Sequence, residues 1–402
     1  MNYMQSIFVI ESLRAGIPTR ISTRELPDLR KNLTDGIIED LASFERGIIP
    51  EGRILWGQYG QGKTHALTSI EHIALDKNFA VSRISLSREV SCHNLHNFYG
   101  YAAPRIKTPD STLEGIQHYL NRFQPSDLPD SRILEKGRYE NDLPATIFED
   151  YFYSEGEERD KLYGDLTGVR LPAGELGRIH RNCRQETMSK HTFKITEHSG
   201  AYFGVMADAL AFCGFEGWVI LIDELELVGR LGKVSRYKAY SNLSRLLNWD
   251  GKMKYPIYTV AAAATRLQDD LWYGKKDDDR SMMPILAAEK FGDEASKEMI
   301  SFFEKAIGGS SLKILPARED DLEKLLDKIS ILHGDAYQWS PELDAESLIH
   351  HLGSQPVRTY IRAALEYLDL QYLYNQKQIP ETVELGELTF DENYLENDEE
   401  AL

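Results

Sequence analysis

Short apolar runs recur along the chain between longer amphipathic stretches. A run that is apolar at nearly every position is typical of a strand buried on both faces of a parallel sheet. Segments expected to be strands lie at 54–56, 79–86, 219–223, 255–265 and 311–316. Helix-like segments separate them, so the pattern predicts an α/β fold in which helices flank a parallel sheet.

Apolar positions three or four residues apart predict helices in much of the remaining chain. Residues 1–49 look mainly helical with a Gly/Pro break at 15–20, and further helices are expected at 65–75, 196–212, 225–248 and from 318 onwards. Residues 271–279 carry a cluster of lysine and aspartate, which indicates a surface loop.

The spacing of the strands predicts the domain organisation. About 150 residues separate positions 64 and 218, far more than one helical crossover needs, so we expect a helical insertion at about residues 90–195. The expected units are an N-terminal helical region (1–49), an α/β core (50–316) that carries the insertion, a helical lid (317–380) and an acidic tail (381–402).

The composition is that of an ordinary globular protein, with 42% hydrophobic and 27% charged residues. No apolar stretch reaches the roughly 18 residues of a membrane helix, and the three cysteines are scattered. We therefore expect a cytoplasmic protein without membrane contact.

The charge is strongly negative and unevenly spread. The net charge is −18, and nine acidic residues from Glu381 onwards account for half of it. An acidic body argues against broad non-specific coating of DNA. Six basic residues between Arg178 and Lys194 offer a grip for a nucleic-acid backbone, although a solvated helix face explains them more simply.

The segment Gly57-Gln58-Tyr59-Gly60-Gln61-Gly62-Lys63-Thr64, followed by His65, fits a phosphate-binding loop. It stands between an expected strand and an expected helix, where glycines let backbone N–H groups point at an anion. Lys63, expected to face solvent without ligand, would reach the phosphates of ATP, and the Thr64 hydroxyl would hold Mg²⁺. The fold class is therefore a P-loop NTPase.

A second motif closes the third expected strand, where Asp223 and Glu224 follow an apolar run. Ligands of α/β sheets sit at the carboxyl ends of strands, so both carboxylates are expected at the phosphates. Asp223 is placed to hold Mg²⁺, and Glu224 is placed to take a proton from the attacking water. Thr265 ends the fourth strand, where it either orients that water or caps the next turn.

Several stretches together resemble an AAA+ ATPase of the Orc/Cdc6-like branch, and more closely the ATP-binding proteins of BREX-type and related phage-defence systems. They are Glu11–Arg20, Trp56–Thr64, Gly217–Glu226, Thr265 and Pro356–Arg358. The resemblance implies an ATPase core, a helical lid and a nucleotide held between them. By the same resemblance Ile17, Pro18 and Arg20 lie near the adenine, Thr265 matches the first sensor and Arg358 the second.

One part of the family pattern is missing. The helix before the last strand is expected to carry an arginine that reaches a neighbouring subunit, but Met299–Ser310 has Lys305 and no arginine. Arg266 and Arg280 are the alternatives, and a surface or structural role explains each more simply.

The leading interpretation is an ATP-hydrolysing motor or switch in a bacterial antiphage defence complex. The expected partners are other defence proteins such as a helicase or nuclease, DNA, and further copies of this chain. Two alternatives stay open: a non-hydrolysing, ATP-dependent scaffold, and a DNA loader that resembles replication initiators. Glu224 counts against the scaffold, and the acidic C-terminus counts against the loader.

Overall fold

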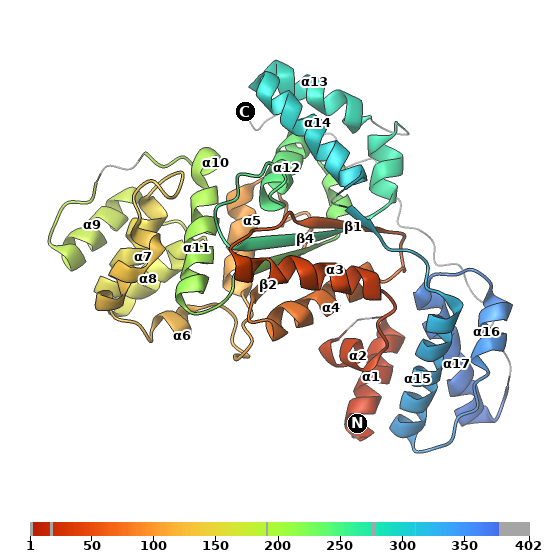
Figure 1. The fold of residues 1–402 in the computed structure, drawn as a ribbon. Coiled ribbons are helices and arrows are strands. Elements are labelled where there is room, and N and C mark those ends of the chain that lie inside the picture. Colours follow the sequence, from red (N-terminus) through yellow and green to blue (C-terminus); the bar gives the residue numbers. More distant parts are fainter. Residues whose placement is uncertain (1–2, 17–18, 190–191, 275–277, 310, 378–402) are drawn as a thin grey trace.

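A five-stranded parallel sheet forms the centre of the molecule (Figure 1). The computed structural model describes residues 3–16, 19–189, 192–274, 278–309 and 311–377. In the order β2-β3-β4-β1-β5, the strands are β2 (Ala80–Ser85), β3 (Trp218–Asp223), β4 (Ile257–Ala264), β1 (Arg53–Gly57) and β5 (Ser311–Lys313). The predicted α/β fold with a parallel sheet is confirmed, and all five expected strands are present.

The sheet brings the ends of the functional strands together. Every residue of β3 is buried, as expected for a strand covered on both faces. Strand β4 lies between β1 and β3, and Gly57 pairs with Ala264 where both strands end. Asp223 ends β3 at the same carboxyl edge. The phosphate-loop motif and the acidic pair therefore meet at one edge of the sheet.

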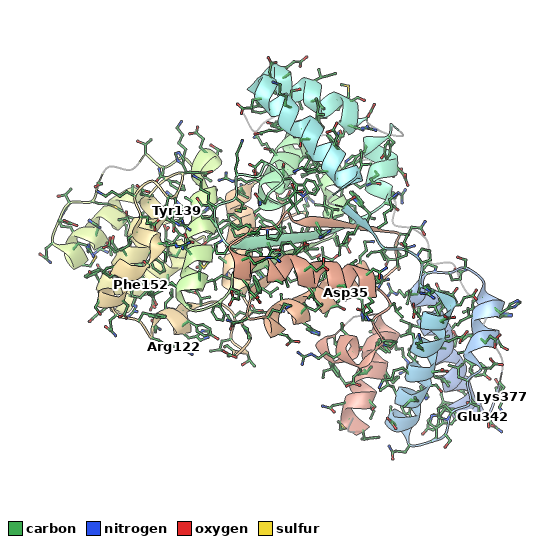
Figure 2. The ribbon with its side chains drawn as sticks, viewed as in Figure 1. Asp35, Arg122, Tyr139, Phe152, Glu342 and Lys377 are labelled. Atoms are coloured by element: carbon green, nitrogen blue, oxygen red, sulfur yellow. The ribbon has the colours of Figure 1, made fainter. Side chains whose placement is uncertain are left out.

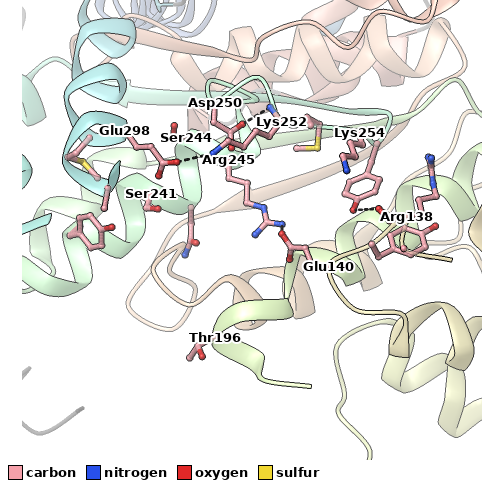
Figure 3. A pocket seen from close by; sticks show the side chains of 18 residues that line it. Arg138, Glu140, Thr196, Ser241, Ser244, Arg245, Asp250, Lys252, Lys254 and Glu298 are labelled. Atoms are coloured by element: carbon pink, nitrogen blue, oxygen red, sulfur yellow. Dashed lines mark hydrogen bonds and ion pairs between the residues drawn. The ribbon is translucent and has the colours of Figure 1, made fainter. Parts of the chain in front are cut away.

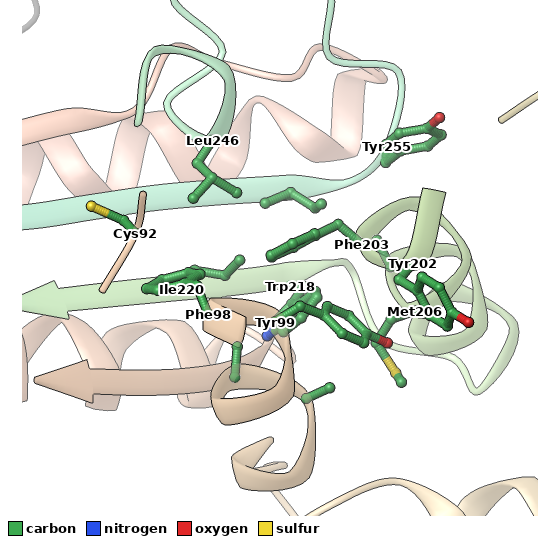
Figure 4. Packing of buried hydrophobic residues seen from close by; sticks show 14 of the residues in the cluster. Cys92, Phe98, Tyr99, Tyr202, Phe203, Met206, Trp218, Ile220, Leu246 and Tyr255 are labelled. Carbon is green, nitrogen blue, oxygen red and sulfur yellow. The ribbon is translucent and has the colours of Figure 1, made fainter. Parts of the chain in front are cut away.

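Helices cover both faces of the sheet. On one face, α3 (Lys31–Ala42) and α4 (Lys63–Asp76) pack their apolar side chains on the strands. On the other, α5 (Leu95–Ala102), α11 (Gly200–Phe212) and α12 (Lys233–Leu246) do the same. Aromatic rings from α5 and α11 surround Trp218 (Figure 4), and the Trp218 indole N–H donates to the Ser82 hydroxyl at 2.9 Å.

The long connection between β2 and β3 is largely helical. Its main helices, beside α5 and α11, are α6 (Gln117–Leu120), α7 (Leu143–Tyr153), α8 (Gly156–Leu166), α9 (Ala173–Arg184) and α10 (Ile195–His198). Figure 2 shows Tyr139 and Phe152 within this part. Two arginines of α9 are partnered: Arg178 pairs with Glu158 at 2.7 Å and Arg184 with Glu149 at 2.8 Å. These ion pairs favour the solvated helix face over a nucleic-acid grip.

The part of the chain after β3 differs from the prediction in one respect. It forms the 3₁₀ segment η5 (Leu225–Arg230), α12, the short π-helical turn η6 (Gln268–Trp272), α13 (Asp279–Phe291) and α14 (Asp293–Ile307). The surface loop expected at 271–279 is wrong at both ends, because Trp272 and Asp279 are each only 1% exposed. Asp279 is buried because the Arg236 guanidinium donates two 2.8 Å hydrogen bonds to its carboxylate.

The C-terminal helices have an apolar core of their own. They are α15 (Glu319–Tyr337), α16 (Ala345–Leu352) and α17 (Val357–Tyr374). The N-terminal helix α1 (Tyr3–Ala15) shares this core, with Val9 and Ile10 fully buried in it, while α2 (Arg20–Glu25) leads from α1 to the α/β core. We call α1 and α15–α17 together the terminal helical group. Figure 2 shows Glu342 and Lys377, an ion pair at one end of this group.

The domain boundaries drawn from the sequence stay predictions. The helices of the expected N-terminal region (1–49) pack in two different places: α1 packs in the terminal helical group, and α3 packs on the α/β core. The acidic tail (381–402) lies outside the described residues. None of the described helices combines the length and apolarity that crossing a bilayer requires.

Candidate functional site

The loop between β1 and α4 has the backbone of an anion cradle. Gly60 and Gly62 adopt left-handed φ values of +77° and +84°, and Gly62 caps the N-terminus of α4. A Cβ atom on Gly62 would stand 3.2 Å from the Arg30 guanidinium, and one on Gly60 would stand 3.2 Å from Pro356. Side chains are therefore disfavoured at both positions by backbone strain, and the close neighbours leave little room for a Cβ atom.

Lys63 corrects an expectation, because its side chain does not face solvent. The residue is only 8% exposed, and its ammonium group donates to the carbonyl oxygens of Gly57 and Gln58, both at 3.3 Å. These distances lie beyond the usual range for N–H···O hydrogen bonds. The ammonium thus points back into the loop, where it is held weakly and is positioned to exchange carbonyl oxygens for phosphate oxygens.

The two residues expected to hold the metal are linked by an arginine. Asp223 is 5% exposed, and Arg83 on β2 donates to its carboxylate at 3.3 Å. The same guanidinium donates to the Thr64 carbonyl at 3.2 Å and to the Thr68 hydroxyl at 2.7 Å. Arg83 therefore fixes β3 against the first turns of α4. Sequence reasoning missed it, because an arginine within a strand carries no motif.

Glu224 stands in an unusual backbone conformation directly after the strand. Its φ of +59° is left-handed, which costs a residue with a side chain about 1–2 kcal/mol. Burial raises the pKa of its carboxyl group, and the nearby charges of Glu226 and Asp223 raise it further. A carboxylate with a raised pKa is a stronger base, which suits general-base chemistry near neutral pH.

Glu226, which sequence reasoning did not single out, connects two parts of the site. Its carboxylate accepts a 2.9 Å hydrogen bond from the Ala264 N–H at the end of β4. The next residue, Thr265, donates its N–H to the Gly57 carbonyl at 3.3 Å. The Thr265 carbonyl accepts from Gln268 at 2.9 Å, so its backbone starts the following turn. Thr265 therefore stands beside the loop, and both of its predicted roles remain compatible with this position.

A cavity of about 250 Å³ opens beside the loop. It lies between the α/β core and the terminal helical group, and its lining includes Leu13, Gly16, Leu26, Arg30, Tyr59, Gly60, Gly62, Lys63, Thr64, His65, Glu224, Glu226, Leu325, Val357, Arg358 and Ile361. Half of the predicted site residues thus line this cavity, whereas Asp223 and Thr265 do not. Ile17 and Pro18 lie outside the described residues, as does the side chain of Arg20, the first residue of α2.

Arg358 reaches the cavity from the second position of α17. Its guanidinium approaches the Tyr59 hydroxyl at 3.5 Å and lies against Gly16, where a Cβ atom would stand 2.4 Å away. Its Nε is buried without a hydrogen-bond partner. The terminal helical group therefore presents a partly unsatisfied cation to the loop.

His65 is held neutral at the opening of α4. Burial lowers its pKa to about 4, and the positive charge of Arg30 adds to this effect. The arginines considered for contact with a second subunit are placed differently. Arg266 pairs with Asp270 in its own turn at 2.9 Å, and Arg280 is exposed on α13.

A larger cavity of about 730 Å³ lies at the opposite, amino edge of the sheet (Figure 3). It has no glycine loop, and its charged groups largely satisfy one another. Arg245 pairs with Glu140, and Lys252 pairs with Glu298 at 3.1 Å. The phosphate-loop cavity is therefore the better candidate site, despite its smaller volume.

Comparison with known proteins agrees with this geometry. The model of the family described as "BREX system ATP-binding protein BrxC/D" matches residues 2–125 and 185–278, which include Lys63, Asp223, Glu224 and Thr265. No curated protein matches the chain. Among solved structures, the Aeropyrum pernix Orc1 protein in complex with DNA is similar at 13% identity and a TM-score of 0.35. That alignment covers 88% of this chain and 62% of the Orc1 chain, and so distant a likeness carries no argument.

The matched ranges make up more than half of the 402 residues and contain both halves of the phosphate site. The parallel sheet, the loop and the family match agree with one another. The chain therefore belongs to the family of BREX system ATP-binding proteins BrxC/D.

Proposed function

We propose that the chain hydrolyses ATP and uses the reaction to move its terminal helical group, as a motor or switch within an antiphage defence complex. One observation carries the proposal: β3 delivers Asp223 and a Glu224 of raised pKa to the edge of the sheet that bears the phosphate loop. A protein that only binds nucleotide has no need of a second, basic carboxylate at this point.

The residues present fit a magnesium nucleotide. Lys63, Arg30 and Arg358 bring three positive charges to the cavity, and Gly60 and Gly62 of the loop also line it. Lys63 and the loop would hold the phosphates, while Thr64 and Asp223 would hold Mg²⁺. When bound, Mg²⁺ supplies positive charge against the phosphate oxygens.

Three other residues of the site would have separate roles in hydrolysis. Glu224 would take the proton of the attacking water. Its carboxyl group has a raised pKa, and it is not held by the Ala264 N–H of β4 as the Glu226 carboxylate is. Thr265, beside the loop on β4, would orient that water. Arg358 would contact the phosphates from α17 and so report occupancy to the terminal helical group.

The DNA-directed part of the function would lie with the partners. The chain is acidic, and the arginines Arg178 and Arg184 are occupied by ion pairs. We therefore propose that a helicase or nuclease of the same defence system supplies the DNA contact, and that this chain supplies the nucleotide switch.

A scaffold that binds ATP without hydrolysing it is the second candidate, and one observation favours it. The described residues of α14 contain no arginine, and Lys305 is occupied by Glu51 and by the Trp249 carbonyl, each at 2.6 Å. The described residues of this helix therefore offer no arginine to complete a neighbour's site.

Phosphate release from MgATP by the purified chain, alone and with DNA and candidate partners, tests the proposal. We expect turnover that depends on Mg²⁺ and falls on Asp223→Asn, with Arg358→Ala slowing turnover far more than it lowers the melting temperature. Binding of ATP without turnover under every condition would establish the scaffold instead.

A further inference from the structure

Arg30 lies over the phosphate loop from the side of α3. It occupies the N-cap position of α3, and its guanidinium donates to the Gln61 carbonyl. It also lines the 250 Å³ cavity next to Lys63 and His65. The guanidinium approaches so closely that a Cβ atom on Gly62 would lie 3.2 Å from one of its nitrogens.

The charge of Arg30 lacks the partner that comparable arginines have. Arg53, Arg138 and Arg236 each donate two hydrogen bonds to one carboxylate. Within the described part of the chain, no carboxylate forms an ion pair with Arg30, and its Nε is buried without a hydrogen-bond partner. The negative charge of Asp28 raises the Arg30 pKa in part, but the Asp28 carboxylate accepts a hydrogen bond from the Arg30 backbone N–H at 2.8 Å rather than from its guanidinium.

Burial without such a partner is costly for a cation. It lowers the Arg30 pKa from its usual value, which means that the charged form is destabilised by its surroundings. An anion in the cavity would remove that cost, because charge-assisted hydrogen bonds to phosphate are strong and suit the fork of a guanidinium. Arg30 and the adjacent loop both line the cavity in which phosphate would lie.

We propose that Arg30 is a phosphate-binding residue of the nucleotide site, acting within its own chain. It holds the phosphate groups from the Gln61–Gly62 end of the loop, while Arg358 faces the Tyr59–Gly60 end. The inference rests on the proposed ATP site and adds a residue to it. It also couples occupancy to α3, because Arg30 is the residue at which that helix begins.

A purely structural role is the competing explanation, in which Arg30 only props the loop through Gln61. Arg30→Gln separates the two roles, since glutamine is polar but carries no charge, and the melting temperature reports whether losing the contact with Gln61 destabilises the fold. Arg53→Gln is the matched control, because Arg53 pairs with Asp40 of α3 and lies outside the cavity.

Calorimetric titration with ATP, ADP and inorganic tripolyphosphate, together with thermal unfolding of the free proteins, provides the test. We expect Arg30→Gln to weaken ATP and tripolyphosphate binding by about 10- to 100-fold, while its melting temperature stays equal to the parent's or rises. Arg53→Gln is expected to show the reverse, with a lower melting temperature and unchanged affinity.

Parental affinity in Arg30→Gln would overturn the inference, as would a loss of affinity explained by a lower melting temperature. These failures differ from failure of the ATP site itself. If the parent bound no ATP, or if Lys63→Met bound it normally, the proposed function would fall, whatever Arg30 does.

Discussion

Replacing Glu224 by glutamine isolates the proposed base with little structural disturbance. Glutamate and glutamine have the same shape, and the cost of the left-handed backbone at φ +59° is similar for both. The neutral amide removes a charge that is already unfavourable, because burial and the charges of Glu226 and Asp223 raise the Glu224 pKa. The folded protein is therefore expected to be as stable as the parent or slightly more so.

The effect on turnover follows from the loss of the base alone. A positioned general base typically contributes about 10²–10⁴-fold, so phosphate release is expected to fall by that factor. ATP binding is expected to persist or tighten, because Lys63 and the loop are unchanged and one negative charge has left the cavity. The variant is thus expected to accumulate with ATP bound.

The assay measures phosphate release and bound nucleotide for the parent and Glu224→Gln side by side. Glu226→Gln is the matched control, since it neutralises a neighbouring carboxylate that is tied to the Ala264 N–H. Equal turnover in the parent and Glu224→Gln would refute the assignment of the base, and a larger loss in Glu226→Gln would move it to the neighbour.

Three further predictions follow from the site and its surroundings. Lys63→Met fills the same buried space without charge, so calorimetry is expected to show ATP affinity about 100-fold weaker or worse, with a small change in melting temperature. Glu226→Gln removes a like charge that raises the Glu224 pKa; because the base acts only when deprotonated, the acid limb of the pH–rate profile is expected to shift to lower pH. Gly168→Ala would place a Cβ atom 2.5 Å from the Gly100 backbone at φ +107°, so denaturant unfolding is expected to show a loss above about 2 kcal/mol, whereas Gly137→Ala, at φ +72° with open space, is expected to lose about 1 kcal/mol.

The parts of the fold that the sequence predicted are those with a local signal. The apolar run at 219–223 and the glycine loop can each be recognised from their own residues. A strand buried on both faces needs apolar residues along its length, and the loop needs glycine at its left-handed positions. The order of the strands could not be obtained this way. That β4 lies between β1 and β3 depends on packing across more than 150 residues of chain.

The parts that were missed or wrong depend on partners distant in sequence. Arg83 donates to Asp223, 140 positions away, and the buried Asp279 carboxylate accepts hydrogen bonds from Arg236 and Tyr240. Lys63 faces inward because the folded loop offers it carbonyl oxygens. Arg30 has no motif at all, and its position over the loop appears only when α3 packs against α4.

The shared core of α1 with α15–α17 also ties the two ends of the described chain together. The chain passes between this helical group and the α/β core at two places, between α1 and α2 and between β5 and α15. Because α1 packs with α15–α17 in one core, any displacement of Arg358 from the loop would have to carry α1 with it.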